Sequence, residues 1–293
     1  MMRSLVEHLV TFFSWIAGLL LMLALLILVG YLLKQGGNTL NLNLIFGDTA
    51  PMDALLLRQQ VFDGLFPAIA GTLLLIAGSM LIAIPVGIAA GIYMAEYCSG
   101  RIKSFFSLLF DILAGVPSIV VGLAGLSLTI FLHRHLSAQI TTCLLISCLS
   151  LALLVLPYLI RTTQTALESI DPLIRRTAPA LGASRLQNIV RVLLPNSISD
   201  IVGGIILATG RCTEDTAVIM LTGAVATAGL PRSIFGQYEA LPFYIYYISS
   251  QYTGPDELAR GFGAAILLLI LCAGLLLSAL WMQRRLTTLL LYR

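Results

Sequence analysis

The sequence contains few charged residues, and this scarcity excludes most kinds of soluble protein. Asp, Glu, Lys and Arg make up 11% of the 293 residues, whereas a soluble domain carries roughly 25%. Hydrophobic residues make up 58%, and the mean hydropathy is +0.96. No run of like charges occurs either, so binding to nucleic acid is not expected. The composition predicts an integral membrane protein, with membrane lipid as its surroundings.

Patterns typical of enzymes and metal sites are also missing. The five cysteines show no Cys-x-x-Cys spacing and no histidine partners in a ligand register, so we expect small apolar packing residues and no metal site. Neither a Gly-x4-Gly-Lys-[Ser/Thr] nucleotide loop nor a catalytic constellation of side chains is present. The chain is therefore predicted to bind no cofactor and to catalyse no reaction itself.

Six long apolar segments are what the sequence does contain. They lie at about 11–33, 66–94, 105–132, 139–160, 197–222 and 261–283. Each is long enough to cross a bilayer as a helix, and lone strands could not satisfy their backbone groups in lipid. The predicted fold is all-α, a polytopic membrane protein with six transmembrane helices. Both termini are expected in the cytoplasm, because 11 basic residues then lie inside and 5 outside.

The fifth segment contains a cluster of three ionisable residues, Arg211, Glu214 and Asp215, deep within an apolar stretch. A central Arg or Asp costs about 2.5 to 3.5 kcal/mol to insert, so such groups usually face one another, a helix bundle or a watery path. Spacings of three and four residues place Arg211 beside both carboxylates on one helical face. This face, with Thr216, is predicted to line a substrate path. The alternative is an ion pair that locks two helices together.

Other segments show signs of close packing and of bending. The run Gly87-Ile-Ala-Ala-Gly91 has small residues four apart, which lets two helix backbones approach in lipid. Pro85 and Pro117 are expected to interrupt their helices, because proline removes an amide donor. The run Gly115-Val116-Pro117-Ser118 is therefore a candidate hinge or gate, with an ordinary bend as the alternative.

The loop at 161–196 is predicted to form two short helices at the inner membrane surface. Asp171 and Pro172 are typical of a helix start, as N-cap and first helical residue. Gly182 can end that helix in the left-handed conformation. Ser184 can cap a second helix over 185–194, which Pro195 would end before the fifth span begins.

This loop resembles the cytoplasmic signature of the type-1 permease subunits of ATP-binding-cassette importers, which reads Glu-Ala-Ala, three residues, Gly, nine residues, Ile-x-Leu-Pro. Ala178, Gly182 and Leu194-Pro195 agree with it, Val192 is a mild change, and Arg176-Thr177 depart. In the family this segment is the coupling helix that docks on the ATPase subunit. The alternative is a basic loop against anionic headgroups. The resemblance implies coupling roles for Arg176, Thr177, Ala178, Gly182, Ala183, Ser184 and Pro195.

Two further runs resemble the phosphate-import permeases of this family, the PstA-like subunits. They are Gly115-Val-Pro-Ser-Ile-Val-Val-Gly122 and Arg211-Cys-Thr-Glu-Asp-Thr-Ala217. The second run has an additional Asp215 between Glu214 and Thr216, which leaves open which carboxylate has the family's role. The resemblance covers about residues 60 to 285. It implies a first helix and external loop at 1–65, a permease domain at 66–285 and a cytoplasmic tail at 286–293.

The resemblance also implies a function and a set of partners. The chain would form part of the path for inorganic phosphate across the cytoplasmic membrane of a prokaryote. Its partners would be a second permease, two cytoplasmic ATPase subunits that use ATP and Mg, and an extracytoplasmic phosphate-binding protein. Three alternatives remain open: a permease for molybdate, tungstate or sulfate, a membrane scaffold for phosphate sensing, and an ATP-independent channel.

The external loop at 223–260 contains an aromatic run, Leu241-Pro-Phe-Tyr-Ile-Tyr-Tyr-Ile248. This run is too short to cross the membrane. It is expected to lie in the interface or to line the outer mouth, where it would either meet a binding protein or anchor the membrane surface.

Overall fold

The structure, a computed structural model, describes residues 2–55, 61, 64–137, 139–231 and 233–291. Within these residues the chain forms helices joined by turns and contains no strand. Six helical stretches are long and apolar enough to span a membrane: Glu7–Thr39, Phe66–Tyr97, Ser118–His135, Leu144–Glu168, Arg185–Glu214 and Pro255–Arg285. The predicted all-α fold with six membrane helices is confirmed.

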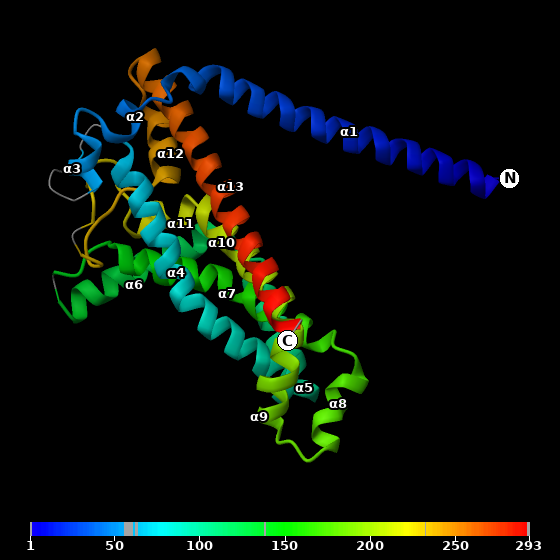
Figure 1. Cartoon of the computed structure of the whole chain (residues 1–293). Coiled ribbons are helices and arrows are strands. Elements are labelled where there is room, and N and C mark those ends of the chain that lie inside the picture. Colours follow the sequence, from blue (N-terminus) through cyan, green and yellow to red (C-terminus); the bar gives the residue numbers. More distant parts are fainter. Residues whose placement is uncertain (1, 56–60, 62–63, 138, 232, 292–293) are drawn as a thin grey trace.

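The first helix, α1 (Met2–Gly36), points away from the rest of the molecule (Figure 1). Among the side chains that the structure describes, those from Glu7 to Leu28 are exposed, and contacts with the bundle occur near the C-terminal end. Gly36 lies against the backbone of α13 (Pro255–Leu291), where a Cβ atom would come within 2.7 Å of the Phe262 carbonyl carbon. The Tyr31 ring meets Phe262 edge to face, with ring centroids 5.8 Å apart.

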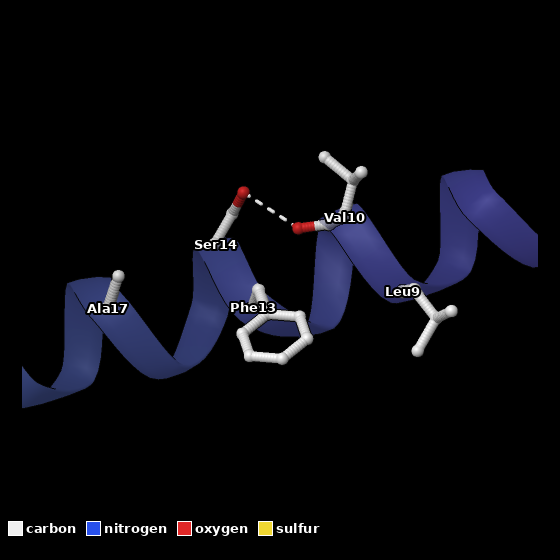
Figure 2. A pocket seen from close by; sticks show the side chains of 5 residues that line it. All are labelled: Leu9, Val10, Phe13, Ser14 and Ala17. Carbon is white, nitrogen blue, oxygen red and sulfur yellow. Dashed lines mark hydrogen bonds between the residues drawn. The ribbon is translucent and has the colours of Figure 1, made fainter.

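The surface of α1 is apolar and almost wholly uncovered. Figure 2 shows one stretch of it, where Leu9, Val10 and Phe13 lie along the helix together with the smaller Ser14 and Ala17. The Ser14 hydroxyl donates to the Val10 carbonyl at 2.8 Å, so this polar group is satisfied within the helix. Such a surface suits a lipid environment or another helix, because apolar side chains cover most of it between Leu9 and Leu33.

The bundle is built around α7 (Leu144–Glu168), which packs between α4 (Phe66–Ile92), α6 (Ser118–His135) and α10 (Leu194–Glu214) (Figure 1). Glycines bring the backbones together. A Cβ atom on Gly87 would lie 2.6 Å from the Leu159 Cβ, and one on Gly91 would lie 2.5 Å from the Thr163 Cβ. The close approach predicted for the Gly87–Gly91 run is therefore confirmed, and its partner is α7.

All five cysteines are free thiols enclosed by these helices. Cys98, Cys143, Cys148 and Cys212 are buried, and Cys272 is partly buried. Cys148 and Cys212 belong to the main apolar core, together with Leu151 and Val155 of α7. Their prediction as small packing residues is confirmed for these two.

The third predicted span, 105–132, consists of two helices. α5 (Gly100–Ala114) ends at Gly115, and α6 begins at Ser118 after Pro117, whose backbone is extended. The interruption predicted at Pro117 is confirmed. The interruption predicted at Pro85 is wrong, because α4 continues through it. Pro85 removes one donor, but Gly87 one half-turn later is held against Leu159 and the helix continues.

The two ends of the bundle carry different connections. α2 (Leu42–Phe46), α3 (Pro51–Leu55) and α12 (Leu241–Gln251) lie at one end, and α8 (Pro172–Ala180) and α9 (Arg185–Asn188) lie at the other (Figure 1). At the α12 end the loop before α12 caps α7. The first amides of α7 need partners outside the helix, and Leu144 and Leu145 donate to the carbonyls of Gly236 and Ile234 at 3.0 and 2.9 Å.

Candidate functional site

Arg211, Glu214 and Asp215 lie together at the end of α10 that is distant from α8. The Arg211 guanidinium is 3.7 Å from the Glu214 carboxylate and 4.0 Å from that of Asp215. The three side chains differ in burial, with 42% of Arg211, 67% of Glu214 and 3% of Asp215 exposed. The charged groups of Arg211 and Glu214 are thus accessible at the surface of the chain, whereas Asp215 is buried within it.

The burial of Asp215 follows from a break in the fifth predicted span. α10 ends at Glu214, Asp215 is extended, and a separate helix, α11 (Ala217–Thr222), follows. The Asp215 Oδ1 accepts a hydrogen bond from the Val218 amide at 3.0 Å. The prediction of one helix over 197–222 is wrong here, because a short carboxylate side chain can bond to a nearby amide and so end one helix and start another.

Thr216 occupies the junction between α10 and α11. Its side chain is half-buried, and its carbonyl accepts from the Met220 amide at 3.1 Å. The structure therefore brings together the four residues predicted for the substrate path. They differ in exposure and in their place relative to the helix ends. Two have exposed charges, one is a buried cap, and Thr216 begins the next helix.

The break at Gly115–Ser118 lies in the same packed region as the break at Asp215. Val116 packs against the core that contains Cys212 and Val218. Further along α6, a Cβ atom on Gly122 would lie 3.0 Å from the Ala217 carbonyl oxygen. Non-helical backbone within a membrane protein is tolerated where it is buried in protein or lines a water-filled cavity. The two breaks therefore lie in one packed region of the bundle.

The loop between α7 and α10 has the caps that the sequence predicts. The Asp171 side chain accepts from the Leu173 amide at 2.7 Å and starts α8. Gly182 follows α8 with a φ of +86°, in the left-handed region. Ser184 and Gln187 form a reciprocal capping box that starts α9.

Pro195 does not end the second helix, contrary to prediction. The helix runs from Arg185 to Glu214, with a π turn at Ile189–Leu193 that ends two residues before Pro195. In that turn the Leu194 amide bonds to the Ile189 carbonyl, five residues earlier. The wider turn accommodates a residue that has no amide donor and whose ring would clash with a preceding carbonyl, so the chain continues as one helix.

The predicted coupling residues lie on the surface of this loop. Arg176 and Thr177 are exposed on α8, and Ala178 is half-buried beside them. Large apolar side chains are exposed here as well, with 78% of Leu173, 85% of Leu181 and 64% of Leu186 open to solvent. Exposed apolar groups outside the membrane-spanning helices usually mark a contact with another protein.

The opposite end of the molecule has a polar hollow of about 760 Å³. Its wall includes Tyr244 and Tyr247 of the aromatic helix α12, as well as Glu239, Asp256 and Arg260. The Glu239 carboxylate is buried and accepts from the Gly229 amide at 2.7 Å. Burial raises the pKa of Glu239, although hydrogen bonds from the backbone of Gly229 and Ala228 oppose the shift. The aromatic run thus contributes two tyrosines to the wall of this hollow.

The structure also shows contacts that the sequence did not indicate. Glu96 pairs with Arg175 at 2.5 Å, and Asp111 pairs with Arg161 at 2.6 Å. The two residues of the first pair are 79 positions apart in the sequence, and those of the second pair are 50 positions apart. Periodicity within one helix cannot reveal such pairs. In the described part of the chain, no group of three or more His, Cys, Asp or Glu side chains could hold a metal ion.

Comparison with known proteins identifies relatives over most of the chain. The family model described as "Binding-protein-dependent transport system inner membrane component" matches residues 87–288. The chain is 34% identical to the phosphate transport system permease protein PstA of Haemophilus influenzae, over 71% of this chain and 72% of that protein. It is 28% identical to the probable ABC transporter permease protein YqgI of Bacillus subtilis, over 96% of both chains.

Solved structures share the fold. A bacterial alginate ABC transporter, crystallised with an alginate-bound periplasmic protein, has a chain that matches with a TM-score of 0.61 at 20% identity, covering 92% of this chain and 95% of that one. The MetNI methionine ABC transporter in an inward-facing conformation matches with a TM-score of 0.57 at 19% identity, over 82% of this chain and 99% of that one. The chain belongs to the family of inner-membrane components of binding-protein-dependent transport systems, and is a multi-pass permease subunit of an ABC importer.

Proposed function

We propose that this permease subunit carries inorganic phosphate into the cell, in a complex with a second permease, two ATPase subunits and an extracytoplasmic phosphate-binding protein. The observation that carries the proposal is the position of Arg211. Its half-exposed guanidinium lies about one turn before the break between α10 and α11. A guanidinium stays charged and offers a planar set of donors that matches phosphate oxygens. Relatives named as phosphate transport permeases support this cargo.

The arrangement assigns different tasks to the two carboxylates. Glu214 is exposed beside Arg211, so it can pair with the guanidinium when no anion is present and weaken binding enough to permit release. Asp215 is buried and caps α11, so it holds the junction in shape. The trio would have one net negative charge with both acids ionised. The second permease is therefore expected to supply positive charge opposite Arg211.

The loop from α8 to α9 is proposed to face the cytoplasm and to dock on an ATPase subunit. Its exposed leucines provide the apolar contact, and the excess of basic residues on this side favours cytoplasmic termini. ATP and Mg would be used by the ATPase subunits alone. The opposite hollow, walled by Tyr244 and Tyr247, would then meet the binding protein.

Phosphate uptake into proteoliposomes that contain the whole complex tests the assignment. We expect ATP-dependent, vanadate-sensitive uptake that falls about tenfold or more in Arg211→Gln, since one hydrogen bond to a charged group contributes about 1.5–3 kcal/mol. Arg211→Lys should be intermediate because it lacks the bidentate fork. Arg134→Gln, at the exposed end of α6, is the matched control.

Two further measurements in the same uptake assay test the cargo and the role of Asp215. Excess molybdate, tungstate or sulfate should leave phosphate uptake unchanged, and inhibition by one of them would assign that anion instead. Asp215→Asn should transport normally, because its amide oxygen can still accept from Val218. Uptake by Arg211→Gln at the parental rate, in a complex that assembles normally, would disprove the path.

A further inference from the structure

Arg175 makes polar contacts from helix α8 to three other parts of the molecule. None of the nine residues of α8 is buried, so apolar packing does little to fix its position. The Arg175 guanidinium instead contacts the Glu96 carboxylate at 2.5 Å and donates to the Leu167 carbonyl at 2.5 Å. The Asn188 side-chain amide donates to the Arg175 carbonyl at 3.1 Å. Arg175 thus connects α8 to α7, to α9 and to the residue Glu96.

Glu96 belongs to a different part of the chain, a π turn at Tyr93–Tyr97 that ends α4. In this turn the Cys98 amide bonds to the Tyr93 carbonyl at 3.0 Å. Only 9% of the Glu96 side chain is exposed. A carboxylate so placed needs a partner, because an unpaired buried charge is strongly destabilising. Single π turns inserted in α-helices often occur at functional positions.

The same π turn also meets α9. The Arg185 guanidinium lies over the Tyr97 ring, 5.1 Å from its centroid. A hollow of about 290 Å³ separates the elements, and its wall includes Glu96, Arg175 and Asn188. The apolar cluster nearby joins Ile92 to Leu167, Ile189 and Leu193, and among the described residues it includes none from α8. Polar side chains, rather than packing, therefore connect α8 to α4.

This connection has a mechanical consequence. In the chain, α7 precedes α8, and α9 leads into α10. A displacement of the α8–α9 loop is therefore transmitted to α7 and α10 through the backbone. It reaches α4 only through side chains, and α4 packs along α7 through Gly87 and Gly91. Without the Glu96–Arg175 pair, α4 could keep its packing on Leu167, Ile189 and Leu193 while α8 moved.

We propose that Glu96 and Arg175 are positioning residues that tie the coupling loop to α4, so that α4 follows the loop when the ATPase moves it. The proposal rests on the assignment of this loop to ATPase docking under the proposed function. It adds a pair of residues that transmits motion to a helix not joined to the loop by the chain.

The complete complex in proteoliposomes provides the test, with both phosphate uptake and ATP hydrolysis measured. Glu96→Gln and Arg175→Gln should still bind the ATPase and hydrolyse ATP, but should import about five- to tenfold less phosphate for each ATP consumed. The double variant should be no worse than either single one, since the two residues act through each other. Asp111→Asn is the matched control, because Asp111 pairs with Arg161 at a similar distance of 2.6 Å and the pair joins α5 to α7.

Three results would overturn the proposal. The phosphate-to-ATP ratio could be unchanged in the single variants, or the defects of the two variants could add in the double variant. The ATPase could also fail to co-purify with Glu96→Gln, which would show that the pair only keeps the loop folded.

A distance measurement separates this proposal from the assignment of the cargo. Spin labels on Tyr93→Cys in the π turn and Ala180→Cys at the end of α8 report the separation of α4 and α8. With Glu96 and Arg175 intact, the separation should stay constant through the ATP cycle, and in Glu96→Gln it should vary. Equal behaviour in both backgrounds would refute the link. A complex that moves another anion but shows the expected distances would refute only the cargo.

Discussion

Gly78 of α4 lies directly against Cys148 of α7, and this contact makes a sharp prediction. A Cβ atom on residue 78 would lie 2.7 Å from the Cys148 sulfur and 3.6 Å from its Cβ. Carbon atoms in good contact lie about 3.5–4.0 Å apart. Only 5% of Cys148 is exposed, and core side chains surround it, so the sulfur has little room to move. Gly78→Ala should therefore lower the free energy of unfolding by about 1–3 kcal/mol, the usual cost of overpacking.

Replacing the cysteine should relieve this cost. In Gly78→Ala/Cys148→Ala the sulfur is absent and the two Cβ atoms lie 3.6 Å apart, an ordinary contact. We expect the double variant to be more stable than the sum of the single effects predicts by about 1–2 kcal/mol. Thermal unfolding of the purified chain in detergent measures this, and Gly78→Ala should lower Tm by several degrees.

Gly274→Ala on α13 is the matched control, since a Cβ atom there would have no neighbour within 4 Å. It should be at least as stable as the parent, because alanine favours a helix by about 0.5–1 kcal/mol over glycine. A Gly78→Ala variant as stable as this control, or one that Cys148→Ala does not rescue, would show that α4 and α7 are not packed at this distance.

Further predictions concern the loops at the two ends. Gly182→Ala should destabilise the α8–α9 turn by about 1 kcal/mol because φ is +86°, and amide hydrogen exchange in α9 should speed up, with Gly182→Asn milder. Ser184→Ala should cost α9 about 1 kcal/mol through the lost capping box, and the same exchange measurement checks it. Burial raises the pKa of Glu239 above 4.5, so the folded state holds its proton more tightly than the unfolded state. The free energy of unfolding should therefore fall as pH rises from 4.5 through the raised pKa, and Glu239→Gln should reduce that fall in chemical denaturation series.

Local signals made the fold and the loop at 161–196 predictable. Six apolar runs of sufficient length specify six membrane helices, because lipid permits few alternatives. Asp171, Ser184 and Gly182 act on amides or dihedral angles within a few residues of themselves, so their effects could be predicted from neighbouring residues.

Features set by distant contacts could not be predicted in this way. Pro85 and Pro117 are the same residue type, yet only Pro117 lies at a break, because packing elsewhere holds each helix. The spacing from Arg211 predicted the contact with Asp215, whose Oδ2 lies 4.0 Å from the guanidinium, but it did not predict that the other oxygen, Oδ1, accepts from the Val218 amide at 3.0 Å. The Glu96–Arg175 pair depends on where α4 ends relative to α8, which no local pattern specifies.

The enclosed cysteines have a practical consequence for mapping the protein in its membrane. Four of the five thiols are shielded, and the fifth, Cys272, lies within the long α13 helix. A membrane-impermeant maleimide should therefore react poorly with the parent chain. Leu181 follows α8 and Tyr252 follows α12, and both are exposed. A single cysteine at either position would then report sidedness without prior removal of the native thiols. Labelling from one face of a sealed vesicle would establish which end lies in the cytosol.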